Sequence, residues 1–183
     1  YALHIAPQDG RSAPRKIALG ESTIYRAPRW SPDSRKIAFM DVHLSLWYVD
    51  LDSGKPVRVA RDRYYGLPDL GASWSPDSKW LAYASRLDNY MSAVHVYSLA
   101  DGKATQVTDG MSDAGDPVWD RSGKYLFFTA STDSGSSLQP DIQAIARTPT
   151  SSIYLIVLDK DDPSPLSPQS DEEVDRSKVD APK

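Results

Sequence analysis

His4, His43 and His95 are the only histidines of the chain, and histidine is the side chain that most often moves protons near neutral pH. Neither a GxSxG nucleophile motif nor an HExxH zinc motif accompanies them. His4 and His95 also fall at the same strand position of two related segments, which favours a structural role for both. We therefore expect no catalytic residue within this stretch.

Two aspartate-rich segments have oxygen ligands at alternate positions, as calcium loops do. They are Asp50 to Asp52, and Asp159 to Asp162. Neither segment has a glutamate placed to close a twelve-residue loop, and both lie where a tight hairpin turn is expected, for which aspartate and glycine are suited. The chain has no cysteine, so it has no thiolate metal site. We expect neither a metal nor a cofactor.

Arginine and tyrosine are the side chains most suited to binding here. They occur in connections that vary in length, and such connections are where repeat proteins usually bind other molecules. Arginine pairs with carboxylates, and tyrosine contributes contact area at low entropy cost. The alternative is that these are ordinary solvated loop residues. The candidate substrate-binding residues are Tyr25, Arg26, Arg61, Arg63, Tyr64, Tyr65, Arg86 and Tyr90.

The elements that must position these residues come from an internal repeat. WSPDSRKIAF begins at Trp30, WSPDSKWLAY at Trp74 and the divergent WDRSGKYLFF at Trp119, at spacings of 44 and 45 residues. A second series, with Gly10, Gly54 and Gly102, runs in step with the first. A fixed period of about 40 to 50 residues is typical of repeat folds in which each unit packs on the next.

Each unit is expected to contain four short strands. In the unit of Trp30 they span about 28–32, 36–42, 44–51 and 56–62, and they are rich in Val, Ile, Tyr, Trp and Phe. Pro32 and Asp33 favour a turn after the first strand, and Gly54 supplies the positive φ of a tight hairpin. Four antiparallel strands per unit predict an all-β chain of β-propeller blades.

The units divide the chain into about three and a half blades. We expect a partial propeller over 1–168 and an acidic, polar linker or loop over 169–183. Closed propellers have about four to eight blades, so the chain is expected to be part of a larger protein. The expected blades span about 1–19, 27–62, 70–108 and 116–167, and an insertion at 130–152 is expected to act as a lid or an interface.

The way that propeller blades pack leads to two further predictions. Trp30, Trp74 and Trp119 occupy the same position of their units, so we expect all three rings in the core between blades. The turns after the first and third strands are short and alike, so we expect them on one face, with the variable connections on the other. Binding is therefore expected on the variable face.

Composition argues against two classes of partner. The formal net charge is -4, without the excess of Lys and Arg that nucleic-acid surfaces need. No apolar run reaches the roughly 18–20 residues of a membrane-spanning helix. We expect neither a nucleic-acid nor a membrane partner.

The repeat resembles the propeller units shared by the tricorn protease, TolB and the prolyl oligopeptidase group. The segment from SLADGKATQVTDG through KYLFFTAST to IYLIVLDKDDPSPLSPQSDEE is most similar to the second, seven-bladed propeller of bacterial tricorn-like serine proteases. The resemblance extends to about Glu173. It implies a cytoplasmic scaffold and gated access path for peptide substrates in intracellular peptide degradation, with the catalytic residues elsewhere in the parent chain.

The resemblance also implies partners, which are peptides or unfolded polypeptide, the remaining blades and the catalytic domains, with a homo-oligomer as an option. Whether the chain belongs to an enzyme stays open. Two alternatives are a non-enzymatic TolB-like propeller that binds protein partners in the periplasm, and the propeller cap of a prolyl oligopeptidase-type enzyme.

Overall fold

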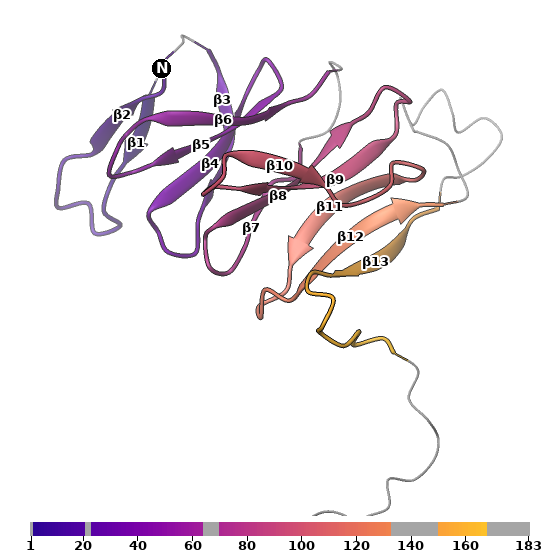
Figure 1. Ribbon diagram of the computed structural model, residues 1–183. Coiled ribbons are helices and arrows are strands. Elements are labelled where there is room, and N and C mark those ends of the chain that lie inside the picture. Colours follow the sequence, from indigo (N-terminus) through magenta and orange to yellow (C-terminus); the bar gives the residue numbers. More distant parts are fainter. Residues whose placement is uncertain (1, 21–22, 64–69, 133–149, 168–183) are drawn as a thin grey trace, which may run out of the picture.

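The computed structural model describes residues 2–20, 23–63, 70–132 and 150–167. Every regular element among them is a β-strand, and the thirteen strands form four antiparallel sheets. The sheets follow one another along the chain and lie side by side as an arc of blades (Figure 1). This arrangement confirms the all-β propeller fold expected from the repeat.

The first two sheets contain two and four strands. The second strand of the Trp30 unit was expected at 36–42, and the structure has it as β4 at Lys36–Asp41. Its register with β5 places Phe39 opposite Trp47. The strands of these sheets are β1 (Ala2–Ile5), β2 (Arg15–Ala18), β3 (Tyr25–Trp30), β4 (Lys36–Asp41), β5 (Ser45–Asp50) and β6 (Pro56–Arg61).

The third sheet has four strands and the fourth has three. A complete unit was expected up to residue 167, but a fourth strand is missing from the described part of this unit. The chain after Val157 forms turns instead, because its prolines lack the N–H that a ladder needs. The strands are β7 (Ser73–Trp74), β8 (Trp80–Arg86), β9 (Ser92–Ser98), β10 (Lys103–Gln106), β11 (Asp113–Trp119), β12 (Tyr125–Ser131) and β13 (Ser152–Val157).

Most of the insertion and the whole of the expected linker lie outside the described residues, as do Tyr64 and Tyr65.

A repeated turn joins the first and second strands of the second, third and fourth blades. In the second blade Ser31 N–H donates to Lys36 O (2.9 Å), and in the third Ser75 N–H donates to Trp80 O (3.0 Å). Ser34 and Ser78 lie at equivalent positions of the two turns, and both have positive φ, at 58° and 60°. Asp33 N–H also donates to Ser78 Oγ of the next blade (3.0 Å), so these turns connect neighbouring blades.

Apolar side chains fill the space between consecutive sheets. One cluster, around Ile17, Phe39 and Val49, lies between the first and second sheets. The others lie at the next two junctions, where Leu46 and Val94 are fully buried. Burying such side chains contributes about 1.5–3 kcal/mol each, so packing between blades holds the arc together.

The three repeat tryptophans differ in burial. Trp74 is buried and Trp119 is half-buried, and each indole N–H donates to a carbonyl in the preceding blade, at Arg29 (3.1 Å) and Ser73 (3.2 Å). Trp30 is 50% exposed, so the prediction of a core position was wrong for this ring. Its preceding blade contributes only β1 and β2 to the described residues, which leaves no inner strand against the ring.

Candidate functional site

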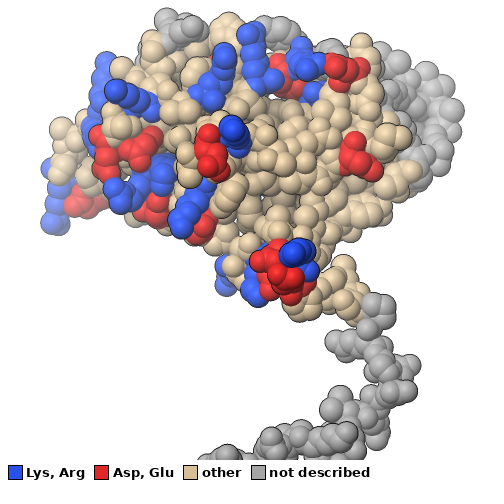
Figure 2. Space-filling model, viewed as in Figure 1, with Lys and Arg blue, Asp and Glu red and all other residues tan. Residues whose placement is uncertain are grey.

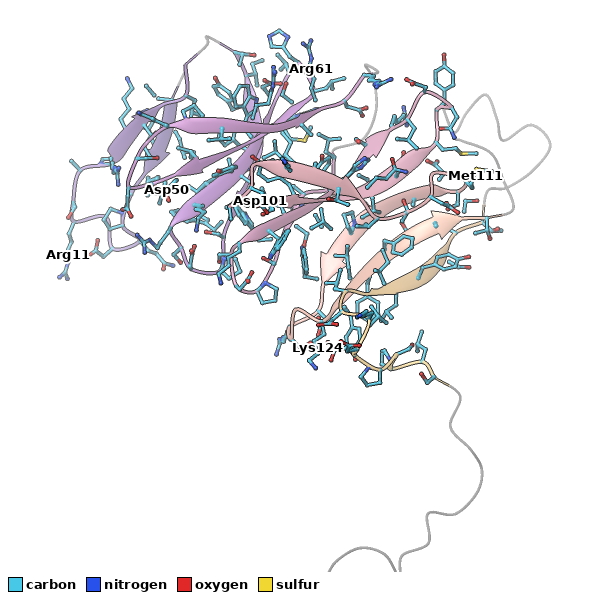
Figure 3. The ribbon with its side chains drawn as sticks, in the orientation of Figure 1. Arg11, Asp50, Arg61, Asp101, Met111 and Lys124 are labelled. Carbon is cyan, nitrogen blue, oxygen red and sulfur yellow. The ribbon has the colours of Figure 1, made fainter. Side chains whose placement is uncertain are left out.

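The short turns after the first and third strands of each unit lie on one face of the arc, and the connections of variable length lie on the opposite face. Leu51 N–H donates to Arg35 O (2.9 Å), which joins the turn after β5 to the turn after β3. On the other face Asp62 N–H donates to Leu44 O (2.9 Å), and Asn89 Nδ2 donates to Gly110 O (2.9 Å). Arg61 lies along the upper edge in Figure 3, and Arg11 and Lys124 along the lower one. This geometry agrees with the expected division of the faces. We call them the variable face and the short-turn face.

Arg86 is the most buried of the candidate binding residues that the structure describes. It ends β8 and is 9% exposed, and its Nη1 has no hydrogen-bond partner among the described residues. Burial lowers the pKa of Arg86, whereas the negative charges of Asp62 and Asp113 raise it. Asp62 Oδ1 accepts from Arg86 N–H (3.4 Å) and from Arg63 N–H (2.8 Å), so the end of β6 is tied to the next blade.

The other arginines are exposed. Arg63 forms an ion pair with Asp88 of the next blade, and both side chains are largely in solvent. Arg61 ends β6 and Arg26 lies at a bulge of β3, where the pairing with β4 shifts between Arg26 and Arg29. The variable face therefore carries several cations on neighbouring blades.

Tyr25 and Tyr90 are the two candidate binding tyrosines that the structure describes, and they differ in what they contact. Tyr25 OH donates to Leu19 O (3.2 Å), and its ring packs edge-on against Phe39 at 5.4 Å. Tyr90 is 45% exposed, with φ at 66°, in the turn that Tyr90 N–H closes on Leu87 O (3.0 Å). Tyr25 is thus used in packing, whereas Tyr90 is a partly exposed turn residue.

A groove of about 610 Å³ runs across the innermost strands of three blades. It is lined by Arg29 and Trp30 of the second blade, Ser73 of the third, and Asp116 and Val118 of the fourth. These residues directly precede or include the repeat tryptophans, at APRW, GASW and DPVW. Reasoning from the variable loops does not identify these residues, although the sequence differences at this fixed position of the repeat are a signal that could have identified them.

The groove is mixed in polarity. Arg29 and Asp116 are exposed at its wall, and Val118 is 56% exposed. Asp116 Oδ2 accepts from Thr129 Oγ1 (3.2 Å), which keeps the carboxylate at the end of a bulge. Opposite charges beside apolar surface suit an extended peptide, which has both polar backbone and apolar side chains.

His95 pairs with serine, but not as a catalytic base would. Its Nδ1 lies 3.3 Å from Ser85 Oγ and 3.0 Å from Ala93 O, and its ring stacks on Tyr83 at 5.3 Å. The Nδ1–H donates to the carbonyl, so this nitrogen has no lone pair for the serine proton. Burial lowers the pKa of His95. The arrangement stabilises a strand pair.

The aspartate-rich segments form turns. Asp50 Oδ1 accepts from the N–H groups of Asp52 and Ser53 (both 3.0 Å), and Asp159 Oδ1 accepts from Asp161 N–H (3.0 Å). Asp162 is paired with Lys124 (2.6 Å). No group of three His, Cys, Asp or Glu side chains suited to a metal occurs among the described residues, and none of the described segments is a helix able to cross a membrane.

Comparison with known proteins gives one family. The family described as "Tricorn protease second beta propeller domain" matches residues 1–183. A tricorn protease homolog of Saccharolobus solfataricus is 25% identical over 121 residues, which is 66% of this chain and 11% of that protein. The Tol-Pal system protein TolB of Alcanivorax borkumensis is 28% identical over 88 residues, or 48% of this chain and 20% of that protein.

Among solved structures, the crystal structure of the tricorn protease is similar in fold, with a TM-score of 0.66 and 23% sequence identity. The similarity covers 96% of this chain and 17% of that chain. The chain thus corresponds to a small part of these relatives.

Proposed function

Because the chain belongs to the family of the tricorn protease second β-propeller domain, we propose that it acts as a scaffold and gated access path for peptides in a tricorn-like serine protease. The catalytic residues then belong to other parts of the parent chain. The proposal places the protein in the cytoplasm, where intracellular peptides are degraded.

One observation carries this proposal. The groove of about 610 Å³ is formed by the innermost strands of three consecutive blades, the position at which a closed propeller has its central channel. Its mixed wall suits an extended peptide. The exposed cations of the variable face at Arg26 and Arg61 provide positive charge for peptide carboxylates.

The experiment narrows the groove in the parent protein. Val118→Trp adds a large ring at an exposed position of the wall, so turnover of a long peptide should fall several-fold while turnover of a dipeptide or tripeptide changes little. Val57→Trp is the matched control, because Val57 is 37% exposed on the outermost strand of the second blade. Equal losses for both peptide lengths, or for both variants, would contradict the access path.

TolB-like binding of protein partners is the second candidate, and the similarity to the Alcanivorax protein favours it. The same pair of variants separates the two functions. A TolB-like propeller would show no peptide turnover in the parent protein, and Val118→Trp would change only the capture of a protein partner.

A further inference from the structure

A second hollow, of about 390 Å³, lies between the third and fourth blades on the short-turn face. It is separate from the groove described above and does not depend on the function proposed there. Its wall combines two indole rings, a carboxylate and aliphatic side chains. Among the lining residues are Pro76, Asp77, Trp80, Val96, Trp119 and Leu158.

The preceding junction shows why the space is open. Tyr48 of β5 pairs with Ala38, and Val96 of β9 pairs with Ala82 at the same position of the next blade. The ring of Tyr48 packs against that of Trp74 at 6.3 Å and an interplanar angle of 82°. Val96 is too short to reach Trp119 in the same way, so one ring is missing from the junction of the third and fourth blades.

The junction of the third and fourth blades also lacks an ion pair that the second blade has. Lys36 N–H donates to Ser31 Oγ, and Trp80 N–H donates to Ser75 Oγ (both 2.9 Å), so Lys36 and Trp80 occupy equivalent positions. Lys36 Nζ pairs with Asp33 Oδ2 at 2.8 Å. Trp80 cannot form such a pair with Asp77.

The carboxylate of Asp77 is therefore held in place but not neutralised. Its Oδ1 accepts from Ser75 Oγ (2.6 Å) and from Lys79 N–H (3.1 Å). No described residue forms a hydrogen bond or ion pair with its Oδ2. Lys124, which follows Gly123 of the lining, is already paired with Asp162 (2.6 Å).

The two indole rings complete the site. Trp119 is held by the bond from its Nε1 to Ser73 O (3.2 Å), and Trp80 is 39% exposed at the rim. Indole faces attract cations, and a guanidinium can stack on them while it pairs with a carboxylate. The space exceeds the lower limit of about 300 Å³ for small-ligand pockets.

We propose that this pocket binds the basic side chain, arginine or lysine, of a peptide. The cation pairs with Asp77 Oδ2, as Lys36 does with Asp33 in the preceding blade, and the aliphatic stem lies beside Val96 and between the indole rings. In this pocket the cation of the peptide side chain occupies the role that Lys36 has at the preceding junction, and its aliphatic stem fills the space that the ring of Tyr48 fills there.

The test uses the whole chain labelled with 5-fluorotryptophan and two probes, Nα-acetyl-arginine amide and its neutral isostere Nα-acetyl-citrulline amide. The five tryptophans give five fluorine signals, which Trp→Phe substitutions assign. Titration with the arginine probe should shift the signals of Trp80 and Trp119 saturably and leave that of Trp47 unchanged. The citrulline probe should bind at least tenfold more weakly.

Two variants and one control complete the design. Val96→Tyr restores the ring of the preceding junction and should weaken binding of the arginine probe at least tenfold. Asp77→Asn retains the shape, lies at an exposed turn and should weaken it at least fivefold. Asp33→Asn, at the equivalent turn position, should leave binding unchanged.

Three results would overturn the proposal. They are a citrulline probe that binds as tightly as the arginine probe, arginine binding that survives Asp77→Asn, and an absence of shifts at Trp80 and Trp119. Because Asp77→Asn removes no core contact, its result decides the question even where Val96→Tyr fails to fold.

Discussion

At the residue scale, the same side chain has different roles in successive units. Trp74 lies in the core between blades, whereas Trp30, 44 residues earlier, is half in solvent. The sequence correctly predicts a shared position for the two rings. Their burial depends on what the preceding blade supplies, and the sequence around each tryptophan does not contain that information.

The first prediction compares these two rings in the 183-residue chain. Trp74→Ala removes a buried ring and its bond to Arg29 O, so the free energy of unfolding should fall by about 3–5 kcal/mol. Trp30→Ala removes an exposed ring and should cost less than about 1 kcal/mol. Urea unfolding measures both. A loss below about 1 kcal/mol for Trp74→Ala would mean that its ring is not part of the core.

The second prediction concerns pH and His95. Burial lowers its pKa in the folded chain below the ordinary value of 6.5, so the folded state disfavours the protonated ring. The unfolded chain then binds more protons below pH 6.5, and stability falls as the pH decreases through that value. The stabilising contribution is fully present above it.

Thermal unfolding between pH 8 and pH 5 measures this effect. His95→Gln should flatten the decline relative to the original chain. His43→Gln is the matched control, because His43 is exposed in the connection between β4 and β5, and its profile should match that of the original chain. Identical profiles for both variants would show that His95 does not contribute to the pH dependence.

At the element scale, the strands follow closely from the sequence. The expected strands at 36–42, 44–51 and 56–62 correspond to β4, β5 and β6, because alternating β-branched and aromatic residues between turn signals specify both type and length. The positions of the bulges and the residue pairs across strands cannot be read from the sequence in this way. The equivalence of Tyr48 and Val96, which explains the second pocket, becomes visible only once the register is known.

The third prediction concerns a backbone position that recurs three residues before each repeat tryptophan. Ala27, Gly71 and Asp116 all have positive φ, at 52°, 60° and 50°, and two of them lie in bulges. This conformation costs a residue other than glycine about 1–2 kcal/mol, whereas glycine loses about 0.5–1 kcal/mol of backbone freedom on folding. Ala27→Gly should therefore stabilise the chain by up to about 1 kcal/mol.

Gly71→Ala is the reciprocal change. A Cβ at Gly71 would lie 3.8 Å from Asp116 Cα, which is ordinary contact, so only the backbone strain should remain. This variant should lose about 1 kcal/mol. Denaturant unfolding of both variants should give opposite signs, and the same sign for both would argue against a shared strained position.

At the scale of the whole molecule, the arc ends in an apolar surface. Phe127 and Ile153 of the fourth blade are 38% and 77% exposed, and the charged groups in Figure 2 are sparse over β12 and β13. In the third blade the equivalent residues, Ala82 and Val94, are fully buried because the fourth blade packs on them. Such a surface is typical of a protein interface, and it suits a further blade.

The last prediction uses one substitution in two settings. In the 183-residue chain Ile153 is exposed, so Ile153→Asp should leave the unfolding free energy within about 0.5 kcal/mol and should reduce self-association. In the complete parent protein a further blade would cover this position, and an unpaired buried carboxylate costs several kcal/mol. The variant should therefore lower the unfolding temperature of the parent propeller. Analytical ultracentrifugation of the chain and calorimetry of the parent protein measure the two effects. A parent protein that tolerates the charge would show that no blade packs on β13, and the arc would then be open at this end.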